Sequence, residues 1–295
     1  MNNIANSEQK SITNIPKISA IYFALLQCGY DYYTIRRDAR HIATLQTFFN
    51  KENHFNFFSK VKQPTCTTYP YWPRAALLET ASFFLDPESK QFQNFNMLQQ
   101  KISSTSNISD TERNQAFWDW LTDFPSALQQ VLQEDNFKSY LKWENEWIAE
   151  QNLIHKKDML YIYDVLNFCL KQYNATKIKE ISVVLNPIKC VYSADYHWIG
   201  NRFIICSGAF SKTTIVHEFL HSIVHPVIKT YQEEILQQKI LCPDIDKSYY
   251  LIDNEIGRLN AFEEYFVRTL TDAVLTENPP TDLHSFLKKI LRNFS

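Results

Sequence analysis

The sequence predicts a mostly helical α+β fold with a small mixed sheet, and three observations support this. Glycine is scarce, with four in 295 residues, which favours helices over β-structure turned by glycine. Apolar residues recur every three to four positions through most of the chain. A region after about residue 180 instead contains short apolar runs rich in β-branched side chains, as buried strands do. The apolar fraction of 45% is ordinary for a globular protein.

Successive helices are expected in the first half, at residues 18–26, 42–49 and 75–84, where the apolar spacing is helical. A rigid loop is predicted at 69–73, because two prolines interrupt the pattern. Residues 103–109 form a polar linker, and 110–113 are typical of a helix start. We therefore predict a helical N-terminal domain over residues 1–150.

The second half changes character after about residue 155. One long helix is predicted over 159–173, and later helices over 213–225, 228–240, 256–275 and 282–291. Strands are predicted at 181–185, 190–192 and 202–206, with a turn at 198–201. We expect the strand at 202–206 to form an edge of the sheet. Residues 151–295 are thus predicted to form a second domain.

Charge and cysteine content narrow the classes of partner and compartment. Lys and Arg number 30 and Asp and Glu 32, so a net charge of −2 gives no reason to expect nucleic acid or an anionic membrane as partner. The longest apolar stretch, residues 18–28, is too short to span a membrane and is predicted to be a buried helix. None of the six cysteines forms a C-x-x-C pair. Reduced thiols and a cytoplasmic location are the default, and secretion stays open if a signal segment precedes this sequence.

The segment His217-Glu218-Phe219-Leu220-His221 is the sharpest chemical feature of the sequence. Residues four apart lie on one face of a helix, so both imidazoles can reach one metal ion. Glu218 then lies beside a metal-bound water as a candidate general base. Apolar side chains at 215, 219, 220 and 223 would hold this helix rigidly. A chance match of so short a motif is the alternative.

The third zinc ligand is not a nearby histidine. Positions 224 and 227 are both valine, which excludes the metzincin pattern. His225 lies eight residues beyond His217, about 12 Å along a helix, too far to share one ion. Pro226 is predicted to end the helix, leaving His225 as a helix-end residue or a substrate contact. A carboxylate from a later helix remains, either Glu263 or Glu264.

Helical periodicity alone does not choose between these two glutamates. Glu263 falls at the edge of the apolar stripe of the helix predicted over 256–275, which would bury it. Glu264 points to a second face of small side chains, which suits a helix packed on both sides. Either carboxylate could therefore face the metal helix.

His217-Glu218-Phe219-Leu220-His221 followed by Pro226, and then Glu264-Tyr265-Phe266-Val267-Arg268, resembles a bacterial family of gluzincin-type peptidases of uncharacterised function. That family carries H-E-F-x-H, then Asn-Pro, then E-x-x-V-R on a downstream helix. The resemblance covers about the last 120 residues. It implies a zincin-like fold and Glu264 as the third zinc ligand. His225 stands where the family has Asn, so the role of that position is open.

These features predict a zinc-dependent hydrolase, a peptidase acting on a peptide or protein substrate. His217, His221 and Glu264 hold Zn²⁺, and Glu218 is the general base. Four further residues are candidates for contacts to the substrate or the transition state: His197, His225, Tyr231 and Arg268. The alternatives are an inactive or non-peptidase zincin relative, and a helical interaction protein with an accidental motif.

Overall fold

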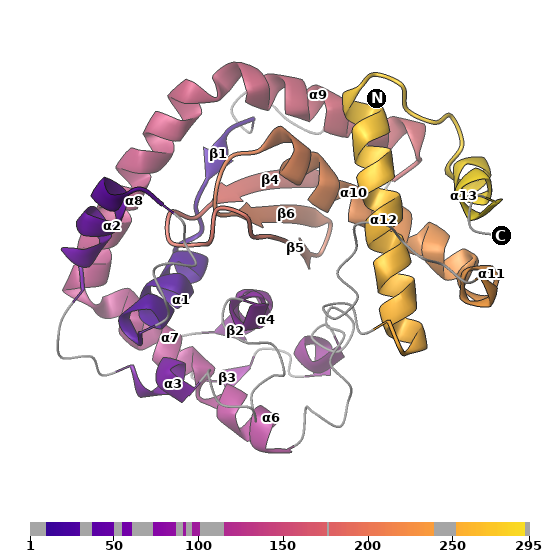
Figure 1. Ribbon diagram of the computed structural model, residues 1–295. Helices are drawn as coiled ribbons and strands as arrows, with labels where there is room; N and C mark the ends of the chain where they lie inside the picture. The colour runs from indigo at the N-terminus through magenta and orange to yellow at the C-terminus, as the bar shows by residue number, and fades with distance from the viewer. Residues whose placement is uncertain are drawn as a thin grey trace.

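A four-stranded mixed sheet lies at the centre of the molecule, with helices on both faces (Figure 1). The computed structural model describes residues 10–29, 37–49, 55–60, 73–86, 91–92, 96–100, 115–175, 177–238 and 252–292. The strands are β1 (Ile12–Thr13), β4 (Glu180–Leu185), β5 (Ala194–Ile199) and β6 (Arg202–Ser207), in the order β1-β4-β6-β5. β1, β4 and β6 are mutually parallel, and β5 is antiparallel to β6.

Alternation along the buried strands supplies one hydrophobic core to each face of the sheet. Val184, Ile204 and Cys206 pack with the N-terminal helices. These are α1 (Pro16–Gln27), α2 (Ala39–Gln46), α3 (Asn56–Ser59), α4 (Pro73–Ser82), α6 (Gln115–Thr122) and α7 (Phe124–Gln133). A two-stranded ribbon, β2 (Leu85–Asp86) with β3 (Gln91–Phe92), lies on the same side.

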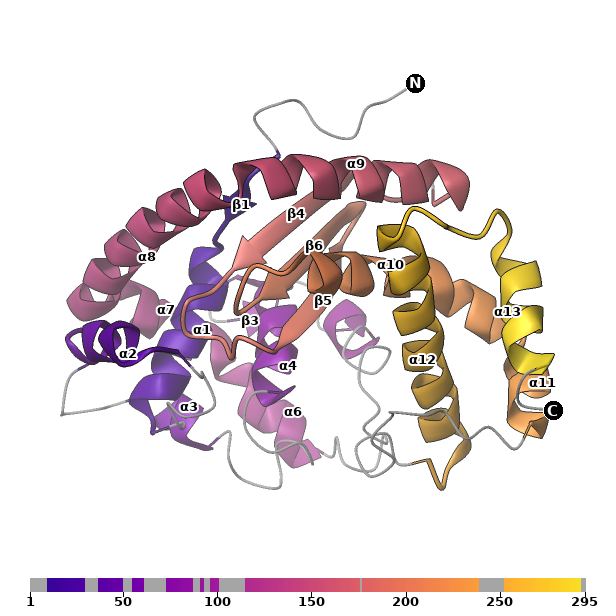
Figure 2. The ribbon, with the colours of Figure 1, turned by 45° about the horizontal axis from the view of Figure 1, so that its top comes forward.

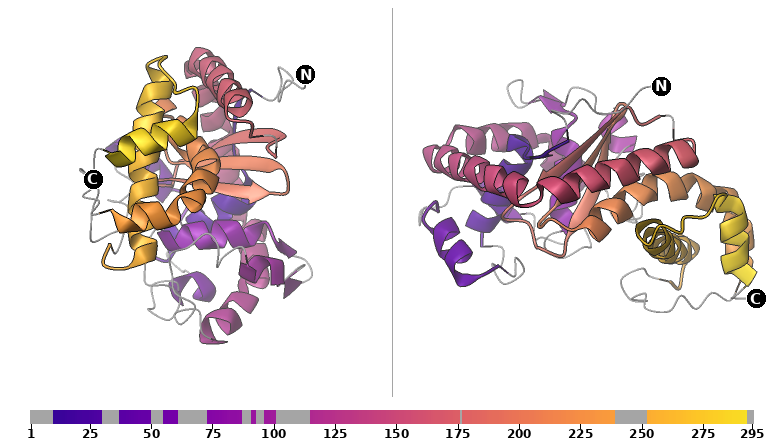
Figure 3. Two further views of the ribbon diagram at one scale, coloured as in Figure 1. Left: turned by 90° about the vertical axis from the view of Figure 1, so that its right-hand side faces the viewer. Right: turned by 90° about the horizontal axis from the view of Figure 1, so that it is seen from above.

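The opposite face of the sheet is covered by α9 (Lys156–Gln172) and α10 (Lys212–Thr230), as Figure 3 shows from above. Val183 and Phe203 pack into this second core. α12 (Glu255–Leu275) packs directly against α10, and α11 (Gln232–Gln237) and α13 (Leu283–Arg292) complete this side. α8 (Asp135–Ile154) and α9 follow one another in an arc around the molecule (Figure 2). This arrangement places α10 between the sheet and α12.

The predicted α+β class with a small mixed sheet is confirmed. The helices expected near residues 18–26, 42–49, 75–84, 159–173, 256–275 and 282–291 all form, as do the strands at 181–185 and 202–206. The helix expected over 228–240 is represented by the end of α10 and by α11. Residues 69–72, 103–109 and 110–113, for which a loop, a linker and a helix start were predicted, lie outside the described residues. Among the described helices, none is long and apolar enough to cross a bilayer.

Three predictions about the sheet need correction. The strand expected at 190–192 is a turn, closed by the Ser193 N–H donating to the Cys190 carbonyl at 2.9 Å, and β5 begins at Ala194. The turn expected over 198–201 narrows to Gly200 and Asn201, since Gly200 has a φ of 60° that suits a two-residue hairpin turn. β6 is not an edge, because β4 and β5 pair with its two sides; among the described strands, β1 and β5 form the two edges.

The prediction that Pro226 ends the metal-motif helix is also wrong. α10 continues through Pro226 to Thr230. Proline fixes φ near the helical value, so it removes one main-chain hydrogen bond without forcing the chain out of the helix. Val227 and Ile228, which follow it, are buried in the core and hold the last turn in place.

The predicted division between residues 150 and 151 falls inside α8, which runs without a break from Asp135 to Ile154. β1, from the N-terminal part, pairs with β4 of the C-terminal part. The side chain of Asn152 binds both the N–H and the carbonyl of Ile12 at 2.8 Å. Two separable domains at this boundary therefore remain a prediction.

Candidate metal centre

The helix that carries His217 and His221 is fixed at its start and along one face. Ser211 is its N-cap, and the Ser211 hydroxyl accepts the Thr214 N–H at 3.2 Å. The apolar face of α10, which includes Ile215 and Phe219, is fully buried. Both histidines lie on the side that faces α12, and both are only partly buried.

Three potential ligand atoms from α10 and α12 converge. The Nε2 atoms of His217 and His221 lie 3.2 Å apart. The Oε2 atom of Glu264 lies 3.4 Å from the first and 3.5 Å from the second. The structure thus brings together the three residues that the sequence suggested as metal ligands.

The size of this triangle suits a zinc ion. Zinc bound tetrahedrally at about 2.0–2.2 Å holds its ligand atoms about 3.3–3.6 Å apart. The separations of 3.4 and 3.5 Å fall within that range, and the 3.2 Å between the two Nε2 atoms lies just below it. Two imidazole nitrogens and one carboxylate oxygen are also a donor set that zinc accepts in catalytic sites.

Glu263 fixes the tautomer of His221 from the far side of the ring. Its Oε1 lies 3.0 Å from His221 Nδ1, so in the neutral ring Nδ1 donates and the lone pair of Nε2 faces the metal position. The other oxygen of Glu263 lies 2.9 Å from Nδ1 of His225. Adjacent glutamates on α12 therefore differ in position: Glu264 lies at the convergence of the Nε2 atoms, and Glu263 lies behind one imidazole.

Charge around the triangle favours a cation. Burial opposes ionisation of Glu264, but hydrogen bonds from His217 and His221 outweigh it and lower the pKa of Glu264. Burial also disfavours a charged His221, yet Glu263 and Glu264 outweigh it and raise its pKa to about 10. Arg268, one turn beyond Glu264, donates from Nε to Glu264 Oε1 at 2.7 Å. Arg268 thus holds the oxygen of Glu264 that does not face the histidines.

Glu218 lies beside the triangle and makes no hydrogen bond or ion pair within the described residues. Burial raises its pKa to about 8, and the nearby carboxylates of Asp195 and Glu264 add to the shift. A carboxylate that takes up a proton this readily is suited to general-base chemistry.

Tyr196 on β5 forms the wall of the site opposite α12. Its ring stacks on the imidazole of His221, with centroids 5.7 Å apart and planes 20° apart. Burial raises the pKa of Tyr196, and the charges of Glu263 and Glu218 add to this effect, which places its phenol in their field.

The free edge of β5 runs past the same site. Gly208 N–H donates to the Ser193 carbonyl at 3.1 Å, and the register pairs Asp195 with Cys206. Because bonded pairs alternate along an antiparallel ladder, the main-chain groups of 195, 197 and 199 point to β6. Those of Ala194, Tyr196 and Trp198 point away from it. No described strand pairs with them.

Two of the residues predicted to contact substrate lie elsewhere. His197 is on the opposite face of β5 from Tyr196 and binds Glu79 and Thr80. Tyr231 follows α10, where its hydroxyl contacts His284 of α13 at 3.2 Å. His225 reaches the site through Glu263, and Arg268 reaches it through Glu264.

A second group of ligand-type residues, Glu79, His197 and Cys206, lies behind the sheet. Here the contacts are those of paired donors and acceptors. His197 Nε2 lies 2.8 Å from Glu79 Oε2, an ordinary hydrogen-bond distance that is shorter than the spacing of zinc ligands. The Lys189 ammonium is already the cation of this group. This second group is therefore a hydrogen-bonded network.

Sequence reasoning missed Tyr196 and the role of Glu263. The alternation of residues 194–199 carried a signal for Tyr196, since placing the strand there puts Asp195 and His197 on one face and Tyr196 on the other. Glu263 had no such signal, because its role depends on how α12 crosses α10.

Comparisons with known proteins identify no relative of this chain. No family model, no curated protein and no solved structure matches the chain. The residues of this centre and their chemistry are therefore the basis for a proposed function.

Proposed function

We propose that this protein is a zinc-dependent peptidase with a zincin-like catalytic half. The observation that carries the proposal is the triangle of His217 Nε2, His221 Nε2 and Glu264 Oε2, with sides of 3.2, 3.4 and 3.5 Å. These three residues would hold the metal, and Glu263 would orient His221 behind it. Bound zinc would lower the pKa of a water molecule and polarise a carbonyl group.

Glu218 is the proton carrier in this proposal. Its carboxylate is partly buried and lacks another partner among the described residues, so it is open to a water molecule at the centre. A Glu218 oxygen takes a proton from the attacking water and passes it to the leaving amine nitrogen. Tyr196, stacked on His221, shields this exchange from solvent on the β5 side.

The outward main-chain groups of Ala194, Tyr196 and Trp198 favour a peptide as the substrate. An extended chain can add to an open sheet edge through main-chain hydrogen bonds. Such a chain would lie alongside Tyr196, next to the ligand triangle. This is the specific reason to prefer a peptide over other hydrolysable substrates.

The decisive experiment combines zinc binding with cleavage of a peptide library. Protein stripped by a chelator should regain one zinc per chain and cleave peptides only when zinc is restored. The matched variants are Glu218→Gln, which should bind zinc and lose about a hundred- to ten-thousand-fold in turnover, and His217→Ala, which should lose the metal.

The outcomes separate the alternatives. Zinc binding without cleavage of any peptide would point to an inactive relative or to another hydrolysis. Failure to bind zinc, or full occupancy in His217→Ala, would leave the motif as an accident in a helical interaction protein. Undiminished turnover of Glu218→Gln would remove Glu218 from the role of base.

A further inference from the structure

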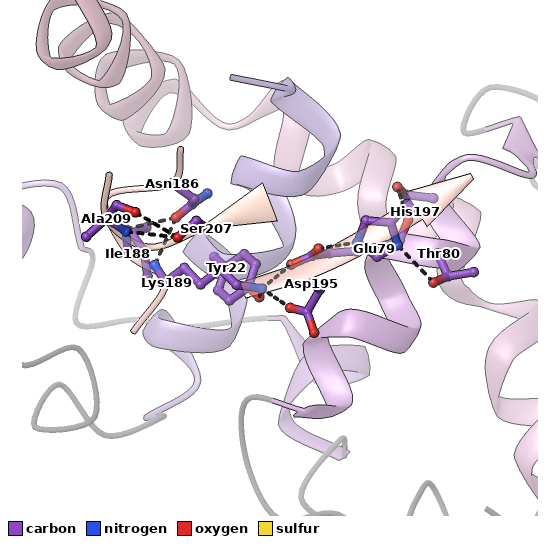
Figure 4. A network of polar contacts seen from close by, with 11 residues as sticks. Tyr22, Glu79, Thr80, Asn186, Ile188, Lys189, Asp195, His197, Ser207 and Ala209 are labelled. Carbon is purple, nitrogen blue, oxygen red and sulfur yellow. Dashed lines mark hydrogen bonds and ion pairs between the residues drawn. The ribbon is translucent and has the colours of Figure 1, made fainter. Parts of the chain in front are cut away.

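A buried polar network lies on the back of β5, on the side away from the candidate metal centre (Figure 4). His197 is held through both ring nitrogens by consecutive residues of α4: Nε2 by Glu79 at 2.8 Å and Nδ1 by Thr80 at 3.2 Å. Lys189 pairs with Asp195 and lies 3.4 Å from Glu79. These contacts bind β5 to α4 and to the segment before β5, which carries Lys189.

The network reaches a third element, and its members other than Asp195 are closed to solvent. Lys189 Nζ donates to the hydroxyl of Tyr22 on α1 at 2.9 Å. The side chains of Glu79 and Lys189 are 0% exposed, and that of His197 is 4% exposed. Burial opposes both charges, but their mutual attraction outweighs it: the pKa of Glu79 falls to about 2 and that of Lys189 rises. Asp195 adds to the rise for Lys189, so both Glu79 and Lys189 are charged at neutral pH.

Stability alone does not account for such a network. Replacing a buried ion pair by well-packed apolar residues is often neutral or stabilising, because ions lose their hydration on burial. Hydrogen-bonded ions do constrain geometry, because each hydrogen bond fixes the distance and angle between its two partners. An apolar back face would pack β5 against α4 equally well, but non-directional contacts would not fix the position of β5 along α4.

The position of β5 matters on its other face. Side chains alternate along a strand: Asp195 and His197 point to the network, while Tyr196 between them stacks on His221 of the metal centre. β6 is the one strand that pairs with β5 among the described residues. An edge strand of six residues with one partner has few constraints of its own.

We propose that Glu79, Lys189 and His197 are positioning residues, which fix β5 and thereby place Tyr196 and the outward main-chain groups beside His221. They touch neither the ligand triangle nor a substrate. Their effect on peptide binding rests on the proposed function, whereas their effect on the order of β5 does not.

The test measures β5 directly, in the full chain with zinc present. Glu79→Gln keeps the shape of residue 79 but turns a donor toward His197 or Lys189. Hydrogen–deuterium exchange of the amides of 195, 197 and 199, which bond to β6, should become about tenfold faster. Zinc affinity should stay unchanged, because the three ligands lie on α10 and α12. For a peptide that the wild type cleaves, KM should rise about tenfold with kcat nearly constant.

Glu144→Gln is the matched control. Glu144 is an equally buried glutamate on the same side of the sheet, bonded to Ser19, Asn14 and Tyr140, and it does not touch β5. Its substitution should leave the exchange of β5 and KM unchanged. Equal exchange of β5 in Glu79→Gln and Glu144→Gln would overturn the proposal.

A second pair of variants decides the matter if Glu79→Gln does not fold. His197→Gln keeps a donor near the position of Nε2 and should retain slow exchange of β5. His197→Leu fills the space without that donor and should show fast exchange. The same exchange rate in both would refute a positioning role. Failure of the wild type to cleave any peptide would count against the peptidase and leave the exchange result standing.

Discussion

Glu263 and Glu264 are neighbours in sequence with different partners. Glu264 meets the Nε2 atoms of both histidines, whereas Glu263 accepts from the Nδ1 atoms of His221 and His225. Helical periodicity predicted that Glu263 would be buried, and its exposed fraction is 7%. Periodicity could not predict which carboxylate meets the imidazoles, because that depends on the crossing of two helices whose contacting residues, such as His221 and Glu263, lie 42 positions apart in sequence.

The two glutamates should differ in a metal titration. Glu264→Ala removes a ligand and should abolish measurable zinc binding at micromolar protein. Glu263→Ala leaves three ligands but frees the ring of His221, and outer-shell losses of this kind cost about 10- to 100-fold in affinity. The reverse ranking of the two variants, measured with a competing chelator, would exchange the roles assigned to them.

For single residues, the sequence predicts neighbours within one helix or strand, but it does not predict contacts between residues of two different elements. The pair His217 and His221 follows from the helical turn alone. Tyr196 and His221 come from a strand and a helix, and only the packed fold brings their rings together. His197 is a candidate substrate contact by residue type alone, and the sequence did not define which face of the sheet it occupies, because the strand predicted at 190–192 begins at Ala194 instead.

Among the elements, β5 and α10 departed most from expectation. The strands at 181–185 and 202–206 are continuous apolar runs, which identify buried strands from composition. β5 reads Ala-Asp-Tyr-His-Trp-Ile, and its polar residues Asp195 and His197 bond to side chains outside the sheet. β1 has two residues and no pattern to recognise.

Pro226 offers a prediction about α10. It is exposed and lies inside the helix, where it leaves the carbonyl of Ser222 without its helical donor. Pro226→Ala restores that hydrogen bond. An interior proline costs a helix about 3 kcal/mol. Replacing it with alanine also makes the unfolded chain more flexible, which reduces the gain by up to about 1 kcal/mol. Unfolding of Pro226→Ala in urea should therefore show a gain of about 2–3 kcal/mol in the free energy of unfolding.

Zinc affinity should not change in Pro226→Ala, because His217 and His221 precede the restored bond. Lys229→Ala, at an exposed position in the next turn, is the control and should be neutral. A destabilised Pro226→Ala would mean that the proline sets a bend on which the packing of Val227 and Ile228 depends.

On the scale of the whole molecule, two hydrophobic cores share one sheet, and α8 links them. Glu144 of α8 is fully buried and accepts hydrogen bonds from Ser19, Asn14 and Tyr140. The length of the sequence allowed one large core or two modest ones. It could not predict that strands from both halves of the chain form the layer between them, because a pairing from residue 12 to residue 183 leaves no local trace.

Glu144 predicts a pH dependence of folding. Burial raises its pKa to about 7 from an ordinary value of 4.5, although three hydrogen bonds oppose the shift. The folded protein keeps this proton where the unfolded chain has lost it. The contribution of Glu144 to stability is therefore complete below pH 4.5 and is lost as the pH rises to about 7, by about 3 kcal/mol in total.

The measurement compares Glu144→Gln with the wild type by urea unfolding between pH 4 and pH 8. The variant cannot lose a proton, so its stability relative to the wild type should increase across this range by about 3 kcal/mol. Glu150→Gln, an exposed glutamate of the same helix, should show no such trend. A flat difference for Glu144→Gln would mean that the folded protein holds this carboxylate ionised.

The shared sheet has a consequence for synthesis. Gln27, at the end of α1, leaves the ribosome roughly 180 residues before Ser207, the last residue of β6. At about 5–20 residues per second this interval is on the order of ten to forty seconds. Until β6 is synthesised, the apolar sides of α1 and α4 cannot be buried against the sheet. The growing chain must remain soluble with these surfaces open, so the early helices are where a chaperone would act on it.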